Sequence, residues 1–229
     1  MPTGKLLVVA TPIGNLDDLS PRARAALAEA DVVACEDTRR TGLLLSHLGF
    51  KKRLVSLHEH NEQRRLPPLL DEIEAGGTVA LVSDAGTPLI SDPGFLLVRE
   101  ATRRELDVSA VPGPSAILAA LAASGLPPHP FTFVGFPPPK SGKRRTFYRR
   151  FRDLDHTLVV FESPHRLLAS LDDALEALGD RPTVVSRELT KLYEEHLRGR
   201  LSEVRANLGD RPRLKGEYVV VLGGREAPD

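Results

Sequence analysis

The sequence has a single cysteine, Cys35, in 229 residues. An intrachain disulfide is therefore excluded, and the paired cysteines of a typical zinc site are missing. Long hydrophobic runs are also missing. The N-terminal apolar run, residues 6–10, is too short for a signal sequence or a membrane span. We therefore expect a soluble, cytoplasmic protein without membrane contact.

The chain has no excess charge of either sign, with 31 basic and 31 acidic residues. A uniformly basic coat for nucleic acid is excluded, but a local basic face is not, because overall balance can conceal an asymmetric surface. Hydrophobic residues make up 41% and charged residues 27%. This composition is typical of a globular protein and not of a disordered one.

Several cofactor and metal motifs are absent. No G-x-G-x-x-G follows a predicted strand, so the dinucleotide-binding fingerprint is missing. Residues 135–144 resemble a P-loop but place Arg144 where a serine or threonine would contact magnesium. His58 and His60 lie in HEHNE, which is not the metal-binding H-E-x-x-H. A structural or substrate-facing histidine pair is favoured, and we predict no metal.

Short apolar runs alternate with helical patterns, which predicts an α/β protein with largely parallel sheets. The predicted strands are residues 5–10, 31–36, 53–57, 78–84, 107–113, 131–136, 157–162, 182–189 and 216–224. Helices are expected to start at Ser20-Pro21, Asp92-Pro93, Pro114 and Ser163-Pro164, with others over 41–49, 62–77 and 202–209. The proline- and glycine-rich stretch 112–128 marks a domain boundary, and we divide the chain into residues 1–115 and 116–229.

Four loops share one design, in which an apolar strand ends in a small-residue, proline-containing turn. They are residues 10–15, 83–94, 111–116 and 161–166. Ligands of open α/β sheets bind beyond the carboxyl ends of the strands, so the four loops together predict a ligand cleft rather than ordinary turns. The twelve-residue loop 83–94 is the most specific, since loops of that length are usually functional. Asp84 and Asp92 bracket it, and we expect Asp92 to cap the next helix and, second, to contact ligand.

Seven strings now occur in order: TPIGNLDDLS, EDTR, LHEHNE, SDAGTPLISDPG, VPGPSA, ESPHR and RELTK. Together they resemble the ribosomal RNA small-subunit methyltransferase I family, the cytidine 2′-O-methyltransferases of the tetrapyrrole-methylase superfamily. The resemblance implies two α/β domains of tetrapyrrole-methylase type with the active-site cleft between them. It also implies S-adenosyl-L-methionine (SAM) as methyl donor, a cytidine of the decoding centre as the methylated nucleotide, 16S ribosomal RNA or the small ribosomal subunit as substrate, and a homodimer.

The resemblance assigns cofactor contacts to turns of both domains. They are Ile13, Gly14, Ala85, Gly86, Thr87, Ile90, Ser115, Ala116, Phe161 and Leu189. Many superfamily members have Gly-Asp-Pro where this chain has Gly86-Thr87-Pro88. A ribose-binding carboxylate is therefore missing at Thr87, and our hypothesis is that Asp84 supplies it.

Methyl transfer to a hydroxyl needs an in-line arrangement of oxygen, carbon and sulfur, and a general base assists because the hydroxyl is a weak acid. The candidate bases are Glu36, Asp37, His58 and Glu188. Arg39, Arg187 and Lys191 are candidates for holding an RNA phosphate. A structural ion-pair cluster is the competing interpretation for each residue. The predicted catalytic set is Glu36, Asp37, Arg39, Glu188 and Lys191.

Residues 140–152 contain seven basic residues, no acidic residue and three interleaved aromatic rings. Charge for phosphates and rings for unpaired bases are the composition of an RNA contact. A solvated helix with its rings in the core is a compatible alternative. The predicted RNA-binding residues are Lys140, Lys143, Arg144, Arg145, Tyr148, Arg149, His58 and His60.

Two other functions stay open. The first is methylation of a tetrapyrrole or another small acceptor on the same scaffold, against which the basic aromatic stretch argues. The second is a non-catalytic RNA-binding module, against which the small-residue loops argue.

Overall fold

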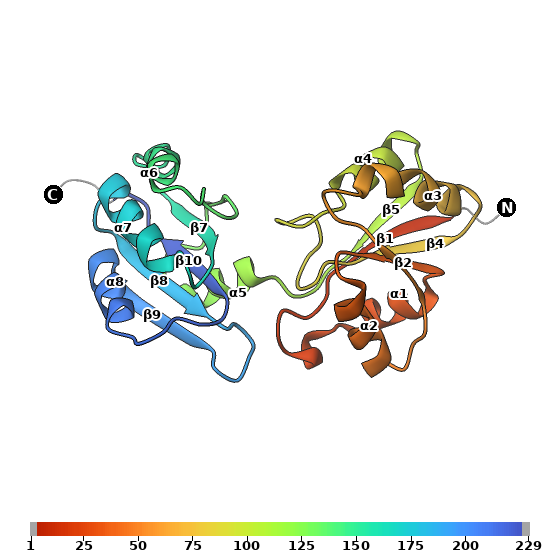
Figure 1. The fold of residues 1–229 in the computed structure, drawn as a ribbon, viewed down its shortest axis with the longest axis horizontal. Coiled ribbons are helices and arrows are strands. Elements are labelled where there is room, and N and C mark those ends of the chain that lie inside the picture. Colours follow the sequence, from red (N-terminus) through yellow and green to blue (C-terminus); the bar gives the residue numbers. More distant parts are fainter. Residues whose placement is uncertain (1–3, 226–229) are drawn as a thin grey trace. The chain divides into compact units, whose positions relative to one another are not determined.

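The computed structural model describes residues 4–225. The chain divides into two compact units, Met1–Ser115 and Ala116–Asp229. In each unit a five-stranded sheet packs against helices (Figure 1). None of the helices in the described part of the chain has the length and apolar composition that crossing a membrane requires.

The sheet of the first unit has the order β3-β2-β4-β1-β5, and all its strands are parallel. The strands are β1 (Lys5–Val9), β2 (Val32–Cys35), β3 (Arg53–Ser56), β4 (Thr78–Leu81) and β5 (Asp107–Val111). The central strands β2 and β4 are buried throughout, as expected for a parallel sheet covered on both faces. Their unbroken runs of apolar residues reflect that burial.

Helices cover both faces of this sheet because successive strand residues point to opposite sides. The helices are α1 (Pro21–Glu29), α2 (Thr38–His47), α3 (Glu62–Glu74) and α4 (Phe95–Arg103), with a short 3-10 turn η1 (Leu16–Asp18). Leu6 of β1 lies in a core with residues of α3 and α4, whereas Leu7 lies in a core with residues of α1 and α2. The start of α1 follows the prediction, since Ser20 Oγ accepts the Ala23 N–H and Pro21 is the first helical residue.

The sheet of the second unit is mostly antiparallel, with the order β6-β7-β10-β8-β9. Its strands are β6 (Phe131–Phe133), β7 (Thr157–Glu162), β8 (Pro182–Arg187), β9 (Glu195–Arg200) and β10 (Tyr218–Leu222). Only the β6–β7 pair is parallel. The prediction of largely parallel sheets is therefore wrong for this unit. Strand β9 escaped prediction because its sequence, EHLRGR, is polar, as is common on a sheet edge.

The second unit contains four helices within the described residues. They are α5 (Ala116–Ser124), α6 (Ser141–Arg149), α7 (Leu167–Leu178) and α8 (Leu201–Gly209). The expected caps at Asp92 and Ser163 are wrong. Helix α4 begins after Gly94, whose backbone is left-handed with φ 113°, and α7 begins after Arg166; neither has a side-chain cap. Asp92 consequently belongs to the loop before α4 and not to the helix.

We predict that Gly94→Ala lowers the free energy of unfolding by about 2–3 kcal/mol. The left-handed backbone strains any L side chain, and a Cβ at this position would lie 2.7 Å from Leu81 Cδ2. The matched control is Gly42→Ala within α2, where a Cβ meets only Leu54 Cδ1 at 3.7 Å. There the substitution should stabilise by about 0.5–1 kcal/mol. Urea unfolding measures both free energies. Equal effects of the two substitutions would contradict the conclusion that the backbone at Gly94 requires glycine.

Candidate functional site

Three of the four small-residue loops meet at the carboxyl edge of the first sheet. The Thr11 N–H donates to Gly86 O at 2.9 Å, and the Gly86 N–H donates to Thr11 O at 3.0 Å. Thr87 Oγ1 donates to Pro114 O at 3.2 Å. The loops after β1, β4 and β5 are thus joined by hydrogen bonds. The fourth loop follows β7 in the second unit.

Gly86 is required for this junction. Its φ is +85°, a conformation that side chains disfavour, and a Cβ would lie 3.2 Å from Ile13 Cγ2. Ile13 is buried beneath the glycine. The close approach of these two loops therefore depends on a residue without a side chain.

The junction leaves groups available for a small ligand. Within residues 4–225, the backbone N–H groups of Ala85 and Thr87 have no hydrogen-bond partner. Ile90 is 41% exposed although it is apolar. Unpaired backbone donors and an exposed apolar side chain in one loop fit a cofactor that combines polar groups with an aromatic ring system. The residues present thus fit SAM on the side of the first unit.

Two predicted cofactor contacts lie in the second unit. Phe161 is half-buried near the end of β7, and its ring packs against Phe133 and Phe136 with centroid distances of 4.9 and 5.4 Å. Leu189 is 8% exposed and follows Glu188, whose φ is +51°. The remaining predicted contacts, Gly14, Ser115 and Ala116, are exposed or half-buried. The cofactor roles of all five residues stay predictions.

Asp84 is already bound to α2. Its Oδ1 accepts the Asp37 N–H at 3.0 Å, and its Oδ2 pairs with Arg40 Nη1 at 3.2 Å. The carboxylate therefore ties the end of β4 to the start of α2. Its ribose contact stays a prediction, because a ribose hydroxyl would have to share these oxygens.

A pocket of about 240 Å³ opens beside Asp84. It is lined by Thr11, Pro12, Leu16, Arg40, Thr41, Leu43, Leu44, His47, Ser83 and Asp84. These residues come from the β1 loop, from α2 and from the end of β4. The pocket thus lies within the first unit, between α2 and the ends of β1 and β4.

Asp37 has a structural role that makes it a poor base. It caps α2, its Oδ1 accepting the Arg39 N–H at 2.8 Å, and it pairs with the Arg39 guanidinium at 2.7 Å. The hydrogen bonds from Arg39 lower the pKa of Asp37 to about 2. A carboxylate of such low pKa binds a proton weakly. Arg39 is itself mostly exposed but is held by this carboxylate.

Glu36 and Asp92 have the opposite electrostatics. Burial, followed by the nearby charges of Asp84 and Glu59, raises the pKa of Glu36. Burial, followed by the charges of Glu36 and Asp84, raises the pKa of Asp92 to about 7. A base works best when its pKa lies near the working pH. Sequence reasoning named Asp92 as a helix cap and, second, a ligand contact, but missed it as a candidate base because the Asp-Pro pair was interpreted mainly as a cap.

The predicted pair Glu188 and Lys191 forms an ion pair in the loop between β8 and β9. Lys191 Nζ contacts Glu188 Oε1 at 2.9 Å and Glu217 Oε2 at 2.8 Å. Burial alone would raise the pKa of Glu188, but hydrogen bonds from Lys191 and the Glu217 N–H outweigh it and lower that pKa. Glu188 is therefore a weaker candidate base than Glu36. The catalytic role of this pair stays a prediction.

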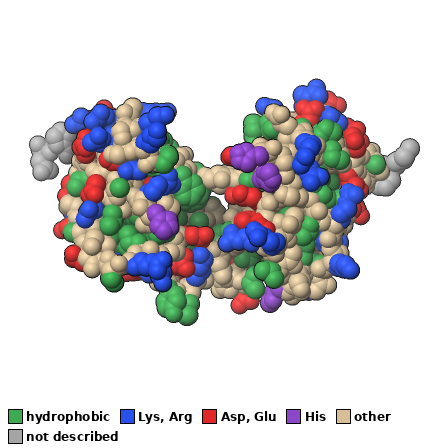
Figure 2. Space-filling view, in the orientation of Figure 1, with side chains coloured by type: hydrophobic (Ala, Val, Ile, Leu, Met, Phe, Trp, Pro, Cys, Tyr) green, Lys and Arg blue, Asp and Glu red, His purple; other side chains and the backbone are tan. Residues whose placement is uncertain are grey.

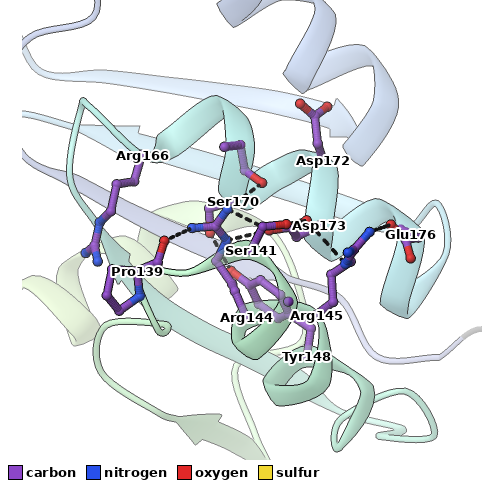
Figure 3. Close-up of polar contacts among 12 residues, drawn as sticks. Pro139, Ser141, Arg144, Arg145, Tyr148, Arg166, Ser170, Asp172, Asp173 and Glu176 are labelled. Carbon is purple, nitrogen blue, oxygen red and sulfur yellow. Dashed lines mark hydrogen bonds and ion pairs between the residues drawn. The ribbon is translucent and has the colours of Figure 1, made fainter.

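The predicted RNA contacts Arg144 and Tyr148 are buried, 3% and 2% exposed. Arg144 donates to Asp173 Oδ2 at 2.7 Å and to two carbonyl oxygens, and Tyr148 Oη lies 2.9 Å from Ser170 Oγ (Figure 3). The prediction that these two side chains bind RNA is wrong. Their spacing of four residues places both on the inner face of α6, against α7.

The other basic residues of α6 lie nearer the solvent. Arg145 and Arg149 both pair with Glu176 of α7, at 2.8 and 3.4 Å, while Lys140 and Lys143 are exposed. Figure 2 shows basic and acidic side chains intermixed on the visible surface of both units. Acidic partners on α7 thus offset part of the positive charge of α6.

His58 and His60 lie between β3 and α3, with ring centroids 6.0 Å apart. The His58 N–H donates to Asn61 Oδ1, while the His60 side chain is exposed. The RNA roles of these histidines, and those of Lys140, Lys143, Arg145 and Arg149, stay predictions.

Comparison with known proteins places this fold and loop arrangement in one class. The family model of the Tetrapyrrole (Corrin/Porphyrin) Methylases matches residues 5–205, which defines a methylase of tetrapyrrole type. The chain belongs to that family and, within it, to the ribosomal RNA small subunit methyltransferase I family. The expected family membership and the two-domain α/β fold class are confirmed.

The relatives match over nearly the whole chain. A "Ribosomal RNA small subunit methyltransferase I" of Thermotoga maritima is 46% identical over 97% of this chain and 100% of its own length. One of Mesorhizobium japonicum is 48% identical over 97% of this chain and 76% of its own length.

Solved structures share the fold at lower identity. A diphthine synthase has a TM-score of 0.72 at 18% identity, covering 98% of this chain and 91% of its own. A uroporphyrin-III C-methyltransferase of Thermus thermophilus, complexed with S-adenosyl homocysteine, has a TM-score of 0.67 at 24% identity, covering 96% and 97%. At these identities the likeness shows the fold alone.

We predict that Arg144→Met lowers the free energy of unfolding by about 3–5 kcal/mol, because the buried Asp173 carboxylate then keeps only the Ser141 Oγ hydrogen bond and a contact with Arg145 at 3.9 Å. The matched control is Arg145→Met on the same helix, which removes an exposed pair with Glu176 and the 3.9 Å contact with Asp173, and should cost less than about 1 kcal/mol. Urea unfolding measures both. A small effect at Arg144 would contradict its place in the core.

We predict that Asp92→Asn stabilises the protein increasingly as pH rises. The raised pKa means that the native state favours a protonated Asp92, so wild-type stability falls between about pH 4 and pH 7 and is flat above. The variant should gain about 1–3 kcal/mol over wild type at pH 8 relative to pH 4. Urea unfolding from pH 4 to pH 8 measures this difference in stability, with Asp71→Asn, an exposed residue of α3, as control. A pH-independent difference would contradict the shift.

Proposed function

We propose that this protein transfers a methyl group from SAM to the 2′-hydroxyl of a cytidine in the decoding centre of 16S ribosomal RNA. The observation that carries the proposal is the hydrogen-bonded junction of the three loops, which leaves the backbone N–H groups of Ala85 and Thr87 unpaired in the described structure, in the loop that also contains Asp92. The names of the relatives support ribosomal RNA as the substrate. We extend the proposal to a homodimer working in the cytoplasm.

SAM, when bound, supplies an activated methyl group on a sulfonium. In the first unit, the N–H groups of Ala85 and Thr87 would orient the donor, and Ile13 and Ile90 would contact its apolar parts. In the second unit, Phe161 and Leu189 are proposed contacts of the same cofactor. Holding donor and hydroxyl in line supplies much of the rate of such a displacement.

The ribose hydroxyl must lose its proton during the transfer. After burial, the charge of Glu36 contributes to raising the pKa of Asp92 to about 7, so near neutral pH Asp92 carries only part of a negative charge. We assign proton acceptance to this pair rather than to Asp37, whose pKa of about 2 makes it too weak a base. Arg39, beside Asp37, would contact an RNA phosphate.

We predict that Glu36→Gln and Asp92→Asn each lower kcat at least about 100-fold, the usual share of a general base, while SAM affinity stays within twofold. Asp37→Asn should lower kcat less than either. The measurement is methyl transfer from labelled SAM to purified small subunits, with SAM binding followed by calorimetry. The control is Asp71→Asn, an exposed side chain on α3.

Three outcomes contradict the proposal. Wild-type turnover in both Glu36→Gln and Asp92→Asn would place the base elsewhere. Labelling of porphyrinoid acceptors instead of small subunits would assign the scaffold to small-molecule methylation. RNA binding without any calorimetric SAM signal would indicate a non-catalytic RNA-binding module.

A further inference from the structure

The segment 162–166, at the end of β7, contains a buried acidic side chain. Glu162 is the last residue of β7, and its side chain is 0% exposed. Its Oε1 accepts the Ser163 N–H at 2.8 Å and pairs with Arg166 Nη2 at 3.0 Å. Its Oε2 is also buried and has no hydrogen-bond partner in the described part of the chain. A carboxyl group in this position costs stability, since buried charge is expensive unless fully paired.

Glu162 holds Arg166 in place. The Arg166 guanidinium pairs with Glu162 through Nη2, and its Nε donates to Ser163 Oγ at 3.2 Å. Two bonds from one five-residue segment thus fix the plane and direction of the guanidinium. Because buried Glu162 costs stability and orients Arg166, we explain its presence by a ligand of Arg166 rather than by folding.

Arg166 has donors left over. Its side chain is 29% exposed, and among residues 4–225 its Nη1 has no hydrogen-bond partner. Figure 3 shows the side chain extending away from the Arg144–Asp173 network. It is also the N-cap of α7, a twelve-residue helix without a side-chain cap, whose positive dipole end lies at this residue. A fixed guanidinium with open N–H groups suits an oxyanion, above all a phosphate bound by two N–H groups.

Arg205 of the same unit, 35% exposed, shows the contrast. Its Nε and Nη2 donate to the two oxygens of Asp172, at 2.6 and 3.0 Å. These two hydrogen bonds form a bidentate pair with a single carboxylate of α7. Arg166 instead contacts Glu162 Oε1 through Nη2 and Ser163 Oγ through Nε, so its Nη1 remains available to a ligand.

We propose that Arg166 binds a phosphate of the RNA substrate and that Glu162 is its positioning residue. The inference rests on the proposed function for the identity of the substrate. A second oxyanion source exists, the carboxylate of the methionine part of SAM, because Phe161 next to Glu162 is a proposed cofactor contact. The experiment below separates the two sources.

The test compares Arg166→Met, Arg166→Lys and Glu162→Gln with the control Arg205→Met. Binding of an RNA fragment copied from the decoding region is measured by fluorescence anisotropy from 50 to 200 mM KCl, and SAM binding by calorimetry. Arg166→Met should weaken RNA binding about tenfold and reduce the slope of log affinity against log salt by about one. Arg166→Lys should keep the slope but recover only part of the affinity, since it keeps the charge and loses the fork.

Glu162→Gln should weaken RNA binding about threefold with the salt slope unchanged, because the charge of Arg166 remains but its orientation is lost. SAM affinity should be unchanged in all variants, and Arg205→Met should bind RNA as wild type does. Thermal unfolding of each variant is recorded, and if Arg166→Met does not fold, Arg166→Lys and Glu162→Gln decide the question.

Unchanged RNA affinity in the Arg166 variants, or in Arg166→Lys and Glu162→Gln if only these fold, would overturn the inference. So would a loss of SAM affinity without a loss of RNA affinity, which would assign the side chain to the cofactor carboxylate. Because RNA binding is read without turnover, failure of methyl transfer would contradict the proposed function and leave this result interpretable.

Discussion

The paired hydrogen bonds between Thr11 and Gly86 are the contact on which the first unit's site depends. They join the loop after β1 to the loop after β4, and the side chain of Thr11 adds a third bond to Ser83 O at 3.2 Å. Both loops follow buried parallel strands, so their ends are fixed by the core. The loop that contains the unpaired Ala85 and Thr87 amides is therefore held in place by this junction.

Acidic groups with unlike pKa values occur together at the ends of β2 and β4 and in the loop before α4. Asp37 is stabilised as an anion by Arg39 at the start of α2, whereas Glu36 and Asp92 lie where burial and neighbouring negative charge favour the protonated form. Environment rather than residue type separates the structural carboxylate from those suited to accept a proton. Asp84, bound to α2 through two contacts, contributes negative charge to both raised groups.

Sequence reasoning recovered local features and missed those set by distant partners. The strands β1 and β4 and the cap at Ser20 follow from apolar runs and turn chemistry, which are local. The antiparallel order of the second sheet depends on β10 inserting between β7 and β8, which no local pattern encodes. Arg144 was predicted to bind RNA because its ion-pair partner, Asp173, lies 29 residues away on another helix, and the local sequence does not reveal that pairing. The four-residue spacing of Arg144 and Tyr148 was the available sign of a buried face.

The central claim is that the junction of the three loops holds SAM, and hydrogen–deuterium exchange with and without SAM tests it most directly. Addition of SAM should slow exchange in residues 83–94, including the backbone amides of Ala85 and Thr87, which have no partner within the described chain. Unchanged exchange in this loop under saturating SAM, or protection confined to segments outside the three loops, would contradict it.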